Sequence, residues 1–306
     1  MVRASIQNLI IWSTRSYISN ERLGWGRLFN FIGSYRRDWL WATAPVKTIR
    51  GKVHGYLMHL NLAEWPDRST YFLKRWYDLE AHLLMKAFIR PGDTVIDVGA
   101  NRGMFALTAS HLVGENGKVI CFEPNPNCIK TLCLEIESNN IRNIRVHRCA
   151  LGMRDEDLTL SVPKYNSGEG TLGKNLFEVN TTYEVPIQVK IGDELLNAEN
   201  PSFIKIDVEG YEVGVLSGLR NTIRSHHPVV ITEVNPKYLT ACGTSFKDLN
   251  ELMFSLGYCG YRSGLKKVNG EYTLNLTPLV EESCDAVWFH VDEHKARVEG
   301  LSAKPT

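Results

Sequence analysis

The sequence predicts an α/β protein with a doubly wound, mostly parallel β-sheet, and three observations support this prediction. Short β-rich runs alternate with segments of helical spacing between residues 94 and 233. The first run leads directly into a glycine-containing turn, Asp97-Val-Gly-Ala-Asn-Arg-Gly103, at the start of a helix. Several runs end in an acidic residue, and the carboxyl ends of parallel strands meet at the edge of a sheet where ligands bind. We expect about seven strands, one of them antiparallel near the C-terminus.

The expected strands are short, apolar and rich in β-branched residues. Those of the parallel sheet cover residues 94–98, 118–122, 144–148, 203–207 and 228–233. Further strands are expected at 158–162, 183–190, 258–262, 271–276 and 285–291. Apolar residues recur at helical spacing elsewhere, and the expected helices cover residues 76–89, 103–112, 126–139, 211–224 and 245–256. Strands and helices that alternate in this way are typical of a parallel, doubly wound sheet.

We expect this sheet to lie in one large domain, residues 76–292. A helical and hairpin appendage at residues 1–75 precedes the domain, and a C-terminal tail at 293–306 follows it. Partial alternation of apolar and polar residues over 52–62 predicts an antiparallel hairpin in the appendage. Trp65-Pro66-Asp67 then predicts a turn.

The appendage has an unusual composition. Residues 1–50 hold eight Lys and Arg residues but only Glu21 and Asp38 as acids, a formal charge of +6 in a chain of net charge +1. The same segment contains four tryptophans, Trp12, Trp25, Trp39 and Trp41. A basic, aromatic surface suits peripheral contact with a membrane or binding of an anionic substrate. A solvated cap whose tryptophans pack on the main domain is the alternative interpretation.

Two further features concern the compartment. No apolar run approaches the roughly 18 residues of a transmembrane helix, and Leu9-Ile10-Ile11-Trp12 is too short for a signal-peptide core. The seven cysteines form no C-x-x-C pair, so we expect reduced thiols rather than a disulfide framework or a zinc cluster. We therefore expect a cytoplasmic protein.

The turn after the first strand indicates a particular kind of ligand. Gly99 and Gly103 allow the backbone to turn sharply and to approach a ligand at a helix N-terminus. A dinucleotide-binding turn would have a third glycine where Asn101 stands. Asp97 would repel a pyrophosphate but attract a cationic sulfonium. Glu123, twenty residues after Gly103, stands where such folds hold ribose hydroxyls.

The run Phe203–Gly210 carries charged residues where a central strand is normally apolar. Lys205, Asp207 and Glu209 alternate with apolar residues, and Glu233 ends the next apolar run. Both faces of a central parallel strand are usually buried, so charges there indicate a function. Each residue alone also has a structural interpretation, as a helix N-cap or as an internal ion pair between Lys205 and Asp207.

With these residues in place, the sequence resembles the FkbM family of methyltransferases over about residues 80 to 260. The resemblance implies a Rossmann-like methyltransferase sheet and S-adenosylmethionine as the cofactor. It is carried by five segments in the expected order, Asp97-Val-Gly-Ala-Asn-Arg-Gly103, Phe122-Glu-Pro-Asn-Pro126, Ala150-Leu-Gly152, Ile204-Lys-Ile-Asp-Val-Glu-Gly210 and Glu233.

The resemblance also implies which residues bind the cofactor. The Asp97–Gly103 turn would hold the methionine part, Glu123 the ribose, and the neighbourhood of Asn125 and Ala150 would border the adenine. Arg102 is expected to point away from the sulfonium. The full implied set is Asp97, Gly99, Asn101, Gly103, Glu123, Asn125, Ala150, Asp207, Tyr77 and Glu80.

Methyl transfer to a hydroxyl requires in-line alignment and a group that accepts the hydroxyl proton. Our hypothesis is that Asp207 or Glu209 accepts this proton and that Lys205 steadies the carboxylates or the developing alkoxide. The polar, glycine-rich loop 165–173 would cover the acceptor. The sequence does not strongly indicate a metal site, but the carboxylates could alternatively hold Mg²⁺.

The expected acceptor is a hydroxyl on a sugar, a glycolipid or a secondary metabolite. A nucleotide-dependent oxidoreductase is one alternative, disfavoured by the missing glycine at Asn101. A non-catalytic Rossmann-like binding module at a membrane is another, disfavoured by the intact charged residues. A nucleic-acid methyltransferase is disfavoured because the chain lacks a wide basic surface and an Asn/Asp-Pro-Pro-aromatic motif, so no nucleic-acid partner is expected.

Overall fold

The structure is a computed structural model that describes residues 2–164, 166–178, 181–268, 271–296 and 298. The chain forms two compact units, one of Met1–Leu79 with Cys133–Asn140 and one of Glu80–Leu132 with Ile141–Thr306. The sequence-based division at residues 75 and 292 stays a prediction. Of the expected tail at 293–306, residues 297 and 299–306 lie outside the described part.

The larger unit is built on an eight-stranded sheet of order β12-β11-β13-β10-β9-β3-β4-β5. The five neighbouring strands β10, β9, β3, β4 and β5 pair in parallel. Strands β13, β11 and β12 each pair antiparallel with their neighbours. The strands are β3 (Thr94–Val98), β4 (Lys118–Phe122), β5 (Ile144–His147), β9 (Phe203–Ile206), β10 (Val229–Val234), β11 (Tyr258–Val268), β12 (Glu271–Pro278) and β13 (Cys284–His290). The predicted fold class is confirmed, with a larger antiparallel part than expected because β12 extends the sheet by a long hairpin with β11.

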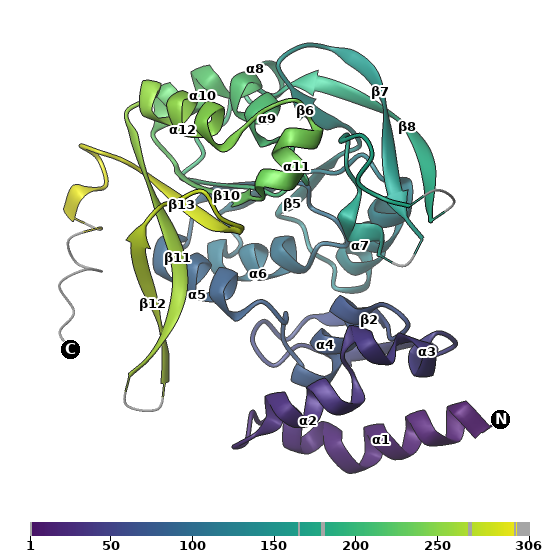
Figure 1. Cartoon of the computed structure of the whole chain (residues 1–306). Helices are drawn as coiled ribbons and strands as arrows, with labels where there is room; N and C mark the ends of the chain where they lie inside the picture. Colours follow the sequence, from purple (N-terminus) through teal and green to yellow (C-terminus); the bar gives the residue numbers. More distant parts are fainter. Residues whose placement is uncertain (1, 165, 179–180, 269–270, 297, 299–306) are drawn as a thin grey trace. The chain divides into compact units, whose positions relative to one another are not determined.

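Helices cover both faces of this sheet, as the prediction of a doubly wound fold requires. Figure 1 shows α5 and α6 on one face and α9, α10 and α12 on the other. The helices that contribute to this unit are α5 (Leu79–Phe88), α6 (Met104–Val113), α7 (Pro126–Ser138), α8 (Gly192–Leu195), α9 (Glu212–Gly218), α10 (Arg220–His226), α11 (Pro236–Ala241) and α12 (Phe246–Ser255).

The single helix expected over 211–224 is interrupted at Leu219, which has φ −109° and ψ 11°. Asp193 accounts for the interruption because its carboxylate accepts the backbone N–H groups of Asn221 at 2.9 Å and Thr222 at 2.8 Å. A side chain that satisfies free N–H groups stabilises a helix N-terminus. Asp193 therefore caps the start of α10.

A three-stranded sheet, of order β6-β8-β7, supplies a second layer of structure in the larger unit. Its strands are β6 (Ala150–Gly152), β7 (Glu156–Pro163) and β8 (Thr182–Ile191), so the runs expected at 158–162 and 183–190 pair as an antiparallel hairpin. Buried Leu160, Val162, Val185 and Ile187 form its core. The hairpin carries the glycine-rich loop between its two strands.

The core of the larger unit lies against the central strands. Ile96, Ile204 and Ile206 are fully buried and pack with apolar residues of α9, α10 and α12. Burying each such side chain contributes roughly 1.5–3 kcal/mol. This continuous apolar packing holds the carboxyl ends of β3 and β9 at fixed positions.

The smaller unit contains α1 (Val2–Ser19), α2 (Trp25–Ile32), η1 (Tyr35–Arg37), α3 (Asp38–Trp41) and α4 (Trp65–Leu73), with β1 (Val46–Arg50) and β2 (Leu57–Asn61). The expected hairpin is present, but its first strand begins at Val46, before the predicted range of 52–62. The turn predicted at Trp65-Pro66-Asp67 is wrong. These residues begin α4, since proline is favoured in the first turn of a helix.

Polar contacts fix the packing of the smaller unit. Arg68 is fully buried, donates to the carbonyl oxygens of Gly33 at 2.7 Å and Leu62 at 2.8 Å, and forms an ion pair with Asp38. Such a network satisfies a buried guanidinium that would otherwise be very costly. In the described part of the chain, no helix combines the length and the hydropathy needed to cross a membrane.

Candidate functional site

A cavity of about 660 Å³, counting the space open to solvent, lies in the larger unit at the carboxyl ends of β3, β4 and β9. The small sheet, α9 and the glycine-rich loop complete its wall. Six of the predicted cofactor-binding residues line it, namely Gly99, Asn101, Glu123, Asn125, Ala150 and Asp207.

The turn after β3 requires the left-handed backbone region at three positions. Gly99 has φ 78°, Asn101 has φ 49° and Gly103 has φ 90°. A Cβ atom added to Gly99 would lie 1.9 Å from the backbone oxygen of Asp207. Glycine is therefore required at position 99, whereas asparagine tolerates this conformation at position 101. Gly103 precedes α6 and is outside the residues that line the cavity.

Glu123 connects the turns that follow β3 and β4. Its buried carboxylate accepts the backbone N–H of Asn101 at 2.7 Å and that of Asn125 at 2.8 Å. Burial raises the pKa of Glu123 to about 7, even though both N–H groups favour the ionised form. The side-chain Nδ2 of Asn125 is also buried and has no hydrogen-bond partner among the described residues. The cavity wall thus offers an unused buried donor.

Lys205 lies between two carboxylates. Its Nζ atom is 3.6 Å from Oδ1 of Asp97 and 3.1 Å from Oδ2 of Asp207, and it donates to the carbonyl oxygen of Gly99 at 3.2 Å. Burial raises the pKa of fully buried Asp97 to about 6, with Lys205 opposing the rise. Burial lowers the pKa of Lys205, but the charges of Asp207 and Asp97 together raise it by more, so the net shift of this pKa is upward. The ammonium group therefore stays charged.

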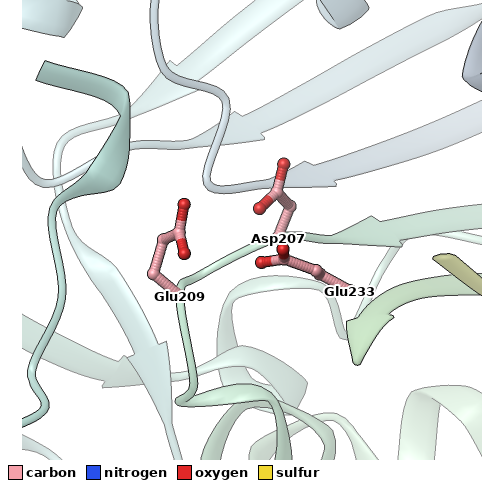
Figure 2. A group of neighbouring side chains, drawn as sticks. All are labelled: Asp207, Glu209 and Glu233. Atoms are coloured by element: carbon pink, nitrogen blue, oxygen red, sulfur yellow. The ribbon is translucent and has the colours of Figure 1, made fainter. Parts of the chain in front are cut away.

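Three carboxylates form a cluster beside this ion pair. Oxygen atoms of Asp207, Glu209 and Glu233 all lie within 4.8 Å of one another, and Figure 2 shows the three carboxyl groups converging. Glu209 has φ 53°, an uncommon conformation for a residue with a side chain. The structure thus brings together all the residues predicted for catalysis. Of these only Asp207 lines the cavity, and Lys205, Glu209, Glu233 and the predicted cofactor contact Asp97 are outside its lining.

The three members of the cluster differ in protonation. Burial, followed by the charges of Glu233 and Asp207, raises the pKa of Glu209 to about 10. Burial and the charge of Asp207 raise the pKa of Glu233 to about 8. Burial and mutual repulsion thus favour the protonated forms of Glu209 and Glu233, whereas Asp207 is 44% exposed and pairs with Lys205. Of the two proposed proton acceptors, Asp207 is the one whose carboxylate pairs with the ammonium of Lys205.

We predict that the stability of the metal-free protein falls as the pH rises toward about 9. When folding raises the pKa of a carboxyl group, the group's contribution to stability is complete at any pH below its ordinary pKa. That ordinary pKa is 4.5 for Glu233. That stabilisation is lost as the pH rises through the folded-state pKa of about 8. Glu233→Gln removes the ionisation and should raise Tm at pH ~9 by about 2–4 °C relative to the unmodified protein.

Thermal unfolding in EDTA at acidic, neutral and alkaline pH measures this effect. Glu251→Gln is the control because Glu251 is an exposed carboxylate on α12 that forms a surface ion pair with Lys247. The control should follow the unmodified protein at every pH. A Glu233→Gln variant that is no more stable than the unmodified protein at alkaline pH would show that the cluster does not strain the fold.

Tyr77 and Glu80, also predicted to contact the cofactor, do not line the cavity. Tyr77 belongs to the smaller unit, where its ring packs 5.1 Å from that of Trp65. The carboxylate of Glu80 accepts a hydrogen bond from Ser263 on β11. Arg102, expected to point away from the cofactor, is likewise outside the lining. The roles of Tyr77 and Glu80 stay predictions.

Thr171 holds the glycine-rich loop in place, a function that sequence reasoning missed. Its buried hydroxyl donates to the backbone oxygen of Glu209 at 2.6 Å and accepts the N–H of Gly173 at 2.9 Å. Its backbone also pairs with Ser161 of β7. Gly168, Gly170 and Leu172 of this loop line the cavity, while residue 165 of the predicted 165–173 lid lies outside the described residues. Tyr211 and Val215 are further lining residues that were not predicted.

Fold and site together define a class of protein. A cavity at the carboxyl edge of a doubly wound sheet, with a glycine turn and a carboxylate after the second strand, is the arrangement of nucleoside-containing cofactor sites. A profile of the methyltransferase FkbM domain matches residues 97–263, more than half of the chain. The protein belongs to the FkbM methyltransferase family, which confirms the resemblance found in the sequence.

Two curated relatives are each 30% identical to parts of this chain. One is "Methyltransferase 1" of Beauveria bassiana, matched over 149 residues, 42% of this chain and 59% of the relative. The other is "Hexuronic acid methyltransferase AglP" of Haloferax volcanii, matched over 154 residues, 48% of this chain and 60% of the relative. The matched region thus spans less than two thirds of either relative.

Solved structures are similar at lower identity. A methyltransferase FkbM from Methylobacillus flagellatus has a TM-score of 0.41 and 18% identity, covering 87% of this chain and 60% of its own. An O-methyltransferase described as SAM-dependent, from Thermotoga maritima, has a TM-score of 0.40 and 11% identity, covering 80% of this chain and 77% of its own.

Proposed function

We propose that this protein is an S-adenosylmethionine-dependent methyltransferase that methylates a hydroxyl group of a sugar, a glycolipid or a related small molecule. The observation that carries the proposal is the position of Asp207. Asp207 lines the cavity. Its carboxylate pairs with Lys205 and adjoins the carboxyl groups of Glu209 and Glu233. A carboxylate that can accept a proton therefore stands at the border between the cofactor cavity and the acidic cluster.

Features of the cavity wall fit S-adenosylmethionine. The cofactor supplies an electrophilic methyl group on a sulfonium, and its net charge is positive. Glu123 stands after β4, where carboxylates hold ribose hydroxyls, and the free Nδ2 of Asn125 can donate to a nitrogen of a base. The bare backbone at Gly99 permits close approach of a ligand. The carboxylates of Asp97 and Asp207, beside the turn after β3, disfavour the pyrophosphate of a nicotinamide dinucleotide.

Each residue beside the cavity then has a task in methyl transfer. Asp207 accepts the proton of the acceptor hydroxyl, and Lys205 stabilises the negative charge that develops on the oxygen. Protonated Glu209 and Glu233 can donate hydrogen bonds to neighbouring hydroxyl groups of a sugar. The loop around Gly168 and Leu172 keeps water away from the reacting groups.

A magnesium ion is the alternative use of the acidic cluster. Carboxylate oxygens suit Mg²⁺, and Asp207, Glu209 and Glu233 could each provide one. We favour proton transfer to Asp207 without a metal because the ammonium of Lys205, 3.1 Å away, already provides the positive charge. Activity that is lost in EDTA and restored by Mg²⁺ would instead assign the cluster to a metal.

An acceptor screen tests the proposed reaction. The purified protein, supplied with S-adenosylmethionine carrying a labelled methyl group, is incubated separately with glucuronosides, neutral glycosides, a glycolipid and matched amino sugars. We expect label in an O-methyl ether of one hydroxylated acceptor, identified by mass spectrometry. Label found only on amino groups would contradict O-methylation while leaving the cofactor assignment intact.

A further inference from the structure

The first 46 residues expose large hydrophobic side chains to an unusual degree. In the described part of the chain, eight of the sixteen exposed large hydrophobic residues lie in this segment. Leu23 is 94% exposed, Trp12 is 83% exposed and Phe31 is 68% exposed. Single exposed apolar residues are common, but a concentration of them marks an interaction surface.

Helix α1 shows that this exposure follows a pattern. Ile6, Leu9 and Trp12, spaced three residues apart, lie on the solvent side of the helix. The opposite side is anchored in the smaller unit, because buried Gln7 donates to the backbone oxygen of Leu40 at 2.8 Å and Ile18 is fully buried. The apolar stripe of Ile6, Leu9 and Trp12 therefore stays exposed to solvent although the opposite side of α1 packs within the smaller unit.

The positive charges of the same segment lack acidic partners. Its two acids are already taken by cations from elsewhere in the chain, Glu21 by Lys52 and Arg75, and Asp38 by Arg68. None of the eight Lys and Arg residues in the first fifty forms an ion pair within the part of the chain that the structure describes. The surfaces of ordinary soluble proteins carry both signs of charge side by side. A surface with unpaired positive charges is therefore suited to bind an anionic partner.

Arginine and aromatic side chains also lie next to one another here. The guanidinium of Arg37 lies 5.2 Å from the ring centre of Phe31, and that of Arg36 lies 5.8 Å from the ring centre of Tyr35. Neighbouring cationic and aromatic groups suit the headgroup region of a bilayer, where rings and charges sit at similar depth. A nucleic acid would pair with the arginines but would leave Leu9 and Leu23 in water.

We propose that residues 1–50 form a peripheral membrane-binding surface for bilayers that contain anionic lipid. Trp12, Leu23 and Phe31 enter the interface between headgroups and acyl chains, and Arg22 and Arg27 attract the anionic headgroups. The surface belongs to the smaller unit, whereas the residues of the carboxylate cluster belong to the larger one. This proposal does not depend on the proposed reaction.

Co-sedimentation of the 306-residue chain with vesicles tests this proposal. The two vesicle types are pure phosphatidylcholine and phosphatidylcholine with about 30% phosphatidylglycerol, in roughly 0.1 M salt. We expect binding to the anionic vesicles, with a blue shift of tryptophan emission, and binding that weakens as salt is raised. No binding to anionic vesicles would overturn the proposal.

Paired variants separate the apolar and the charged contributions. Trp12→Ser with Phe31→Ser, and Arg22→Ser with Arg27→Ser, should each lower vesicle affinity by roughly tenfold or more. The controls are Phe254→Ser, at a 78% exposed aromatic of the larger unit, and Lys247→Ser, at an exposed lysine on the same helix, and neither should change affinity. Circular dichroism verifies that each variant is folded.

Three outcomes would contradict the membrane proposal. Vesicle binding that both double variants retain would place the contact elsewhere in the chain. Binding to single-stranded RNA in place of vesicles would make the surface a nucleic-acid site. Lipid-free dimers that the Trp12→Ser and Phe31→Ser changes dissociate would make it an interface between two copies of this chain.

Discussion

Replacing Asp207 with Asn is expected to lower kcat by about 10²–10⁴-fold, the usual contribution of a positioned general base. The amide has nearly the shape of the carboxylate and can still accept a hydrogen bond from Lys205, which retains Asp97 as an ionic neighbour. It cannot accept a proton from an acceptor hydroxyl. The protein should therefore stay folded, with kcat reduced far more than affinity for the acceptor.

Asp155→Asn is a matched control for this substitution. Asp155 has a 48% exposed side chain, similar to Asp207, and pairs with Lys190 at 2.7 Å on the surface of the same unit. Single-turnover transfer of a labelled methyl group measures both variants. Near-normal turnover in Asp207→Asn would remove this residue from the catalytic role, whereas loss of turnover in Asp155→Asn would point to a general effect of charge.

Gly99→Ala should lower the affinity for the cofactor by a factor on the order of 100 or more, because two costs combine at this position. The left-handed backbone at φ 78° costs a non-glycine residue roughly 1–2 kcal/mol. In addition, the new Cβ would lie 1.9 Å from the backbone oxygen of Asp207, so the end of β9 must move. That movement displaces the proposed base together with the cavity wall.

Gly92→Ala isolates the first of these costs. Gly92 has φ 89°, and nothing lies within 4 Å of a Cβ atom added there. This variant should lose some stability but keep its affinity for the cofactor. Titration calorimetry and thermal unfolding of both variants give the comparison. Equal affinity of Gly99→Ala and the unmodified protein would show that the turn after β3 does not hold the cofactor.

Much of the parallel sheet could be predicted because most residues of β3, β4, β9 and β10 are buried. Such strands appear in a sequence as short apolar runs, and residues such as Glu123 and Glu233 stand out where the runs end. The glycine turn was also visible, since Gly99 and Gly103 flank a helix start. The sequence therefore indicated both the edge of the sheet and the side chains that gather there.

What could not be predicted depends on contacts between residues distant in the chain. Asp97 and Lys205 are direct neighbours across β3 and β9, a register that only the strand order of the folded sheet determines. The interruption at Leu219 depends on capping by Asp193 from another element. Thr171 gave no signal because it lies in a polar loop whose partner, the backbone of Glu209, cannot be inferred from residue type.

The predicted turn at Trp65–Asp67 failed for a different reason. Proline and aspartate favour turns, but they also favour the first turn of a helix. The carboxylate of Asp67 accepts the N–H of Asn61 at 2.8 Å, which joins the end of β2 to the start of α4. Local composition could not decide between the two structures, and the packing of the smaller unit did.

Isothermal titration of the 306-residue chain with S-adenosylmethionine, S-adenosylhomocysteine and NAD tests the central claim most directly. We predict roughly micromolar binding of the first two and none of NAD, because the carboxylates of Asp97 and Asp207 beside the turn after β3 disfavour a pyrophosphate. Protein that is folded but binds neither S-adenosylmethionine nor S-adenosylhomocysteine, or that binds NAD instead, would contradict the assignment of the cavity and the function built on it.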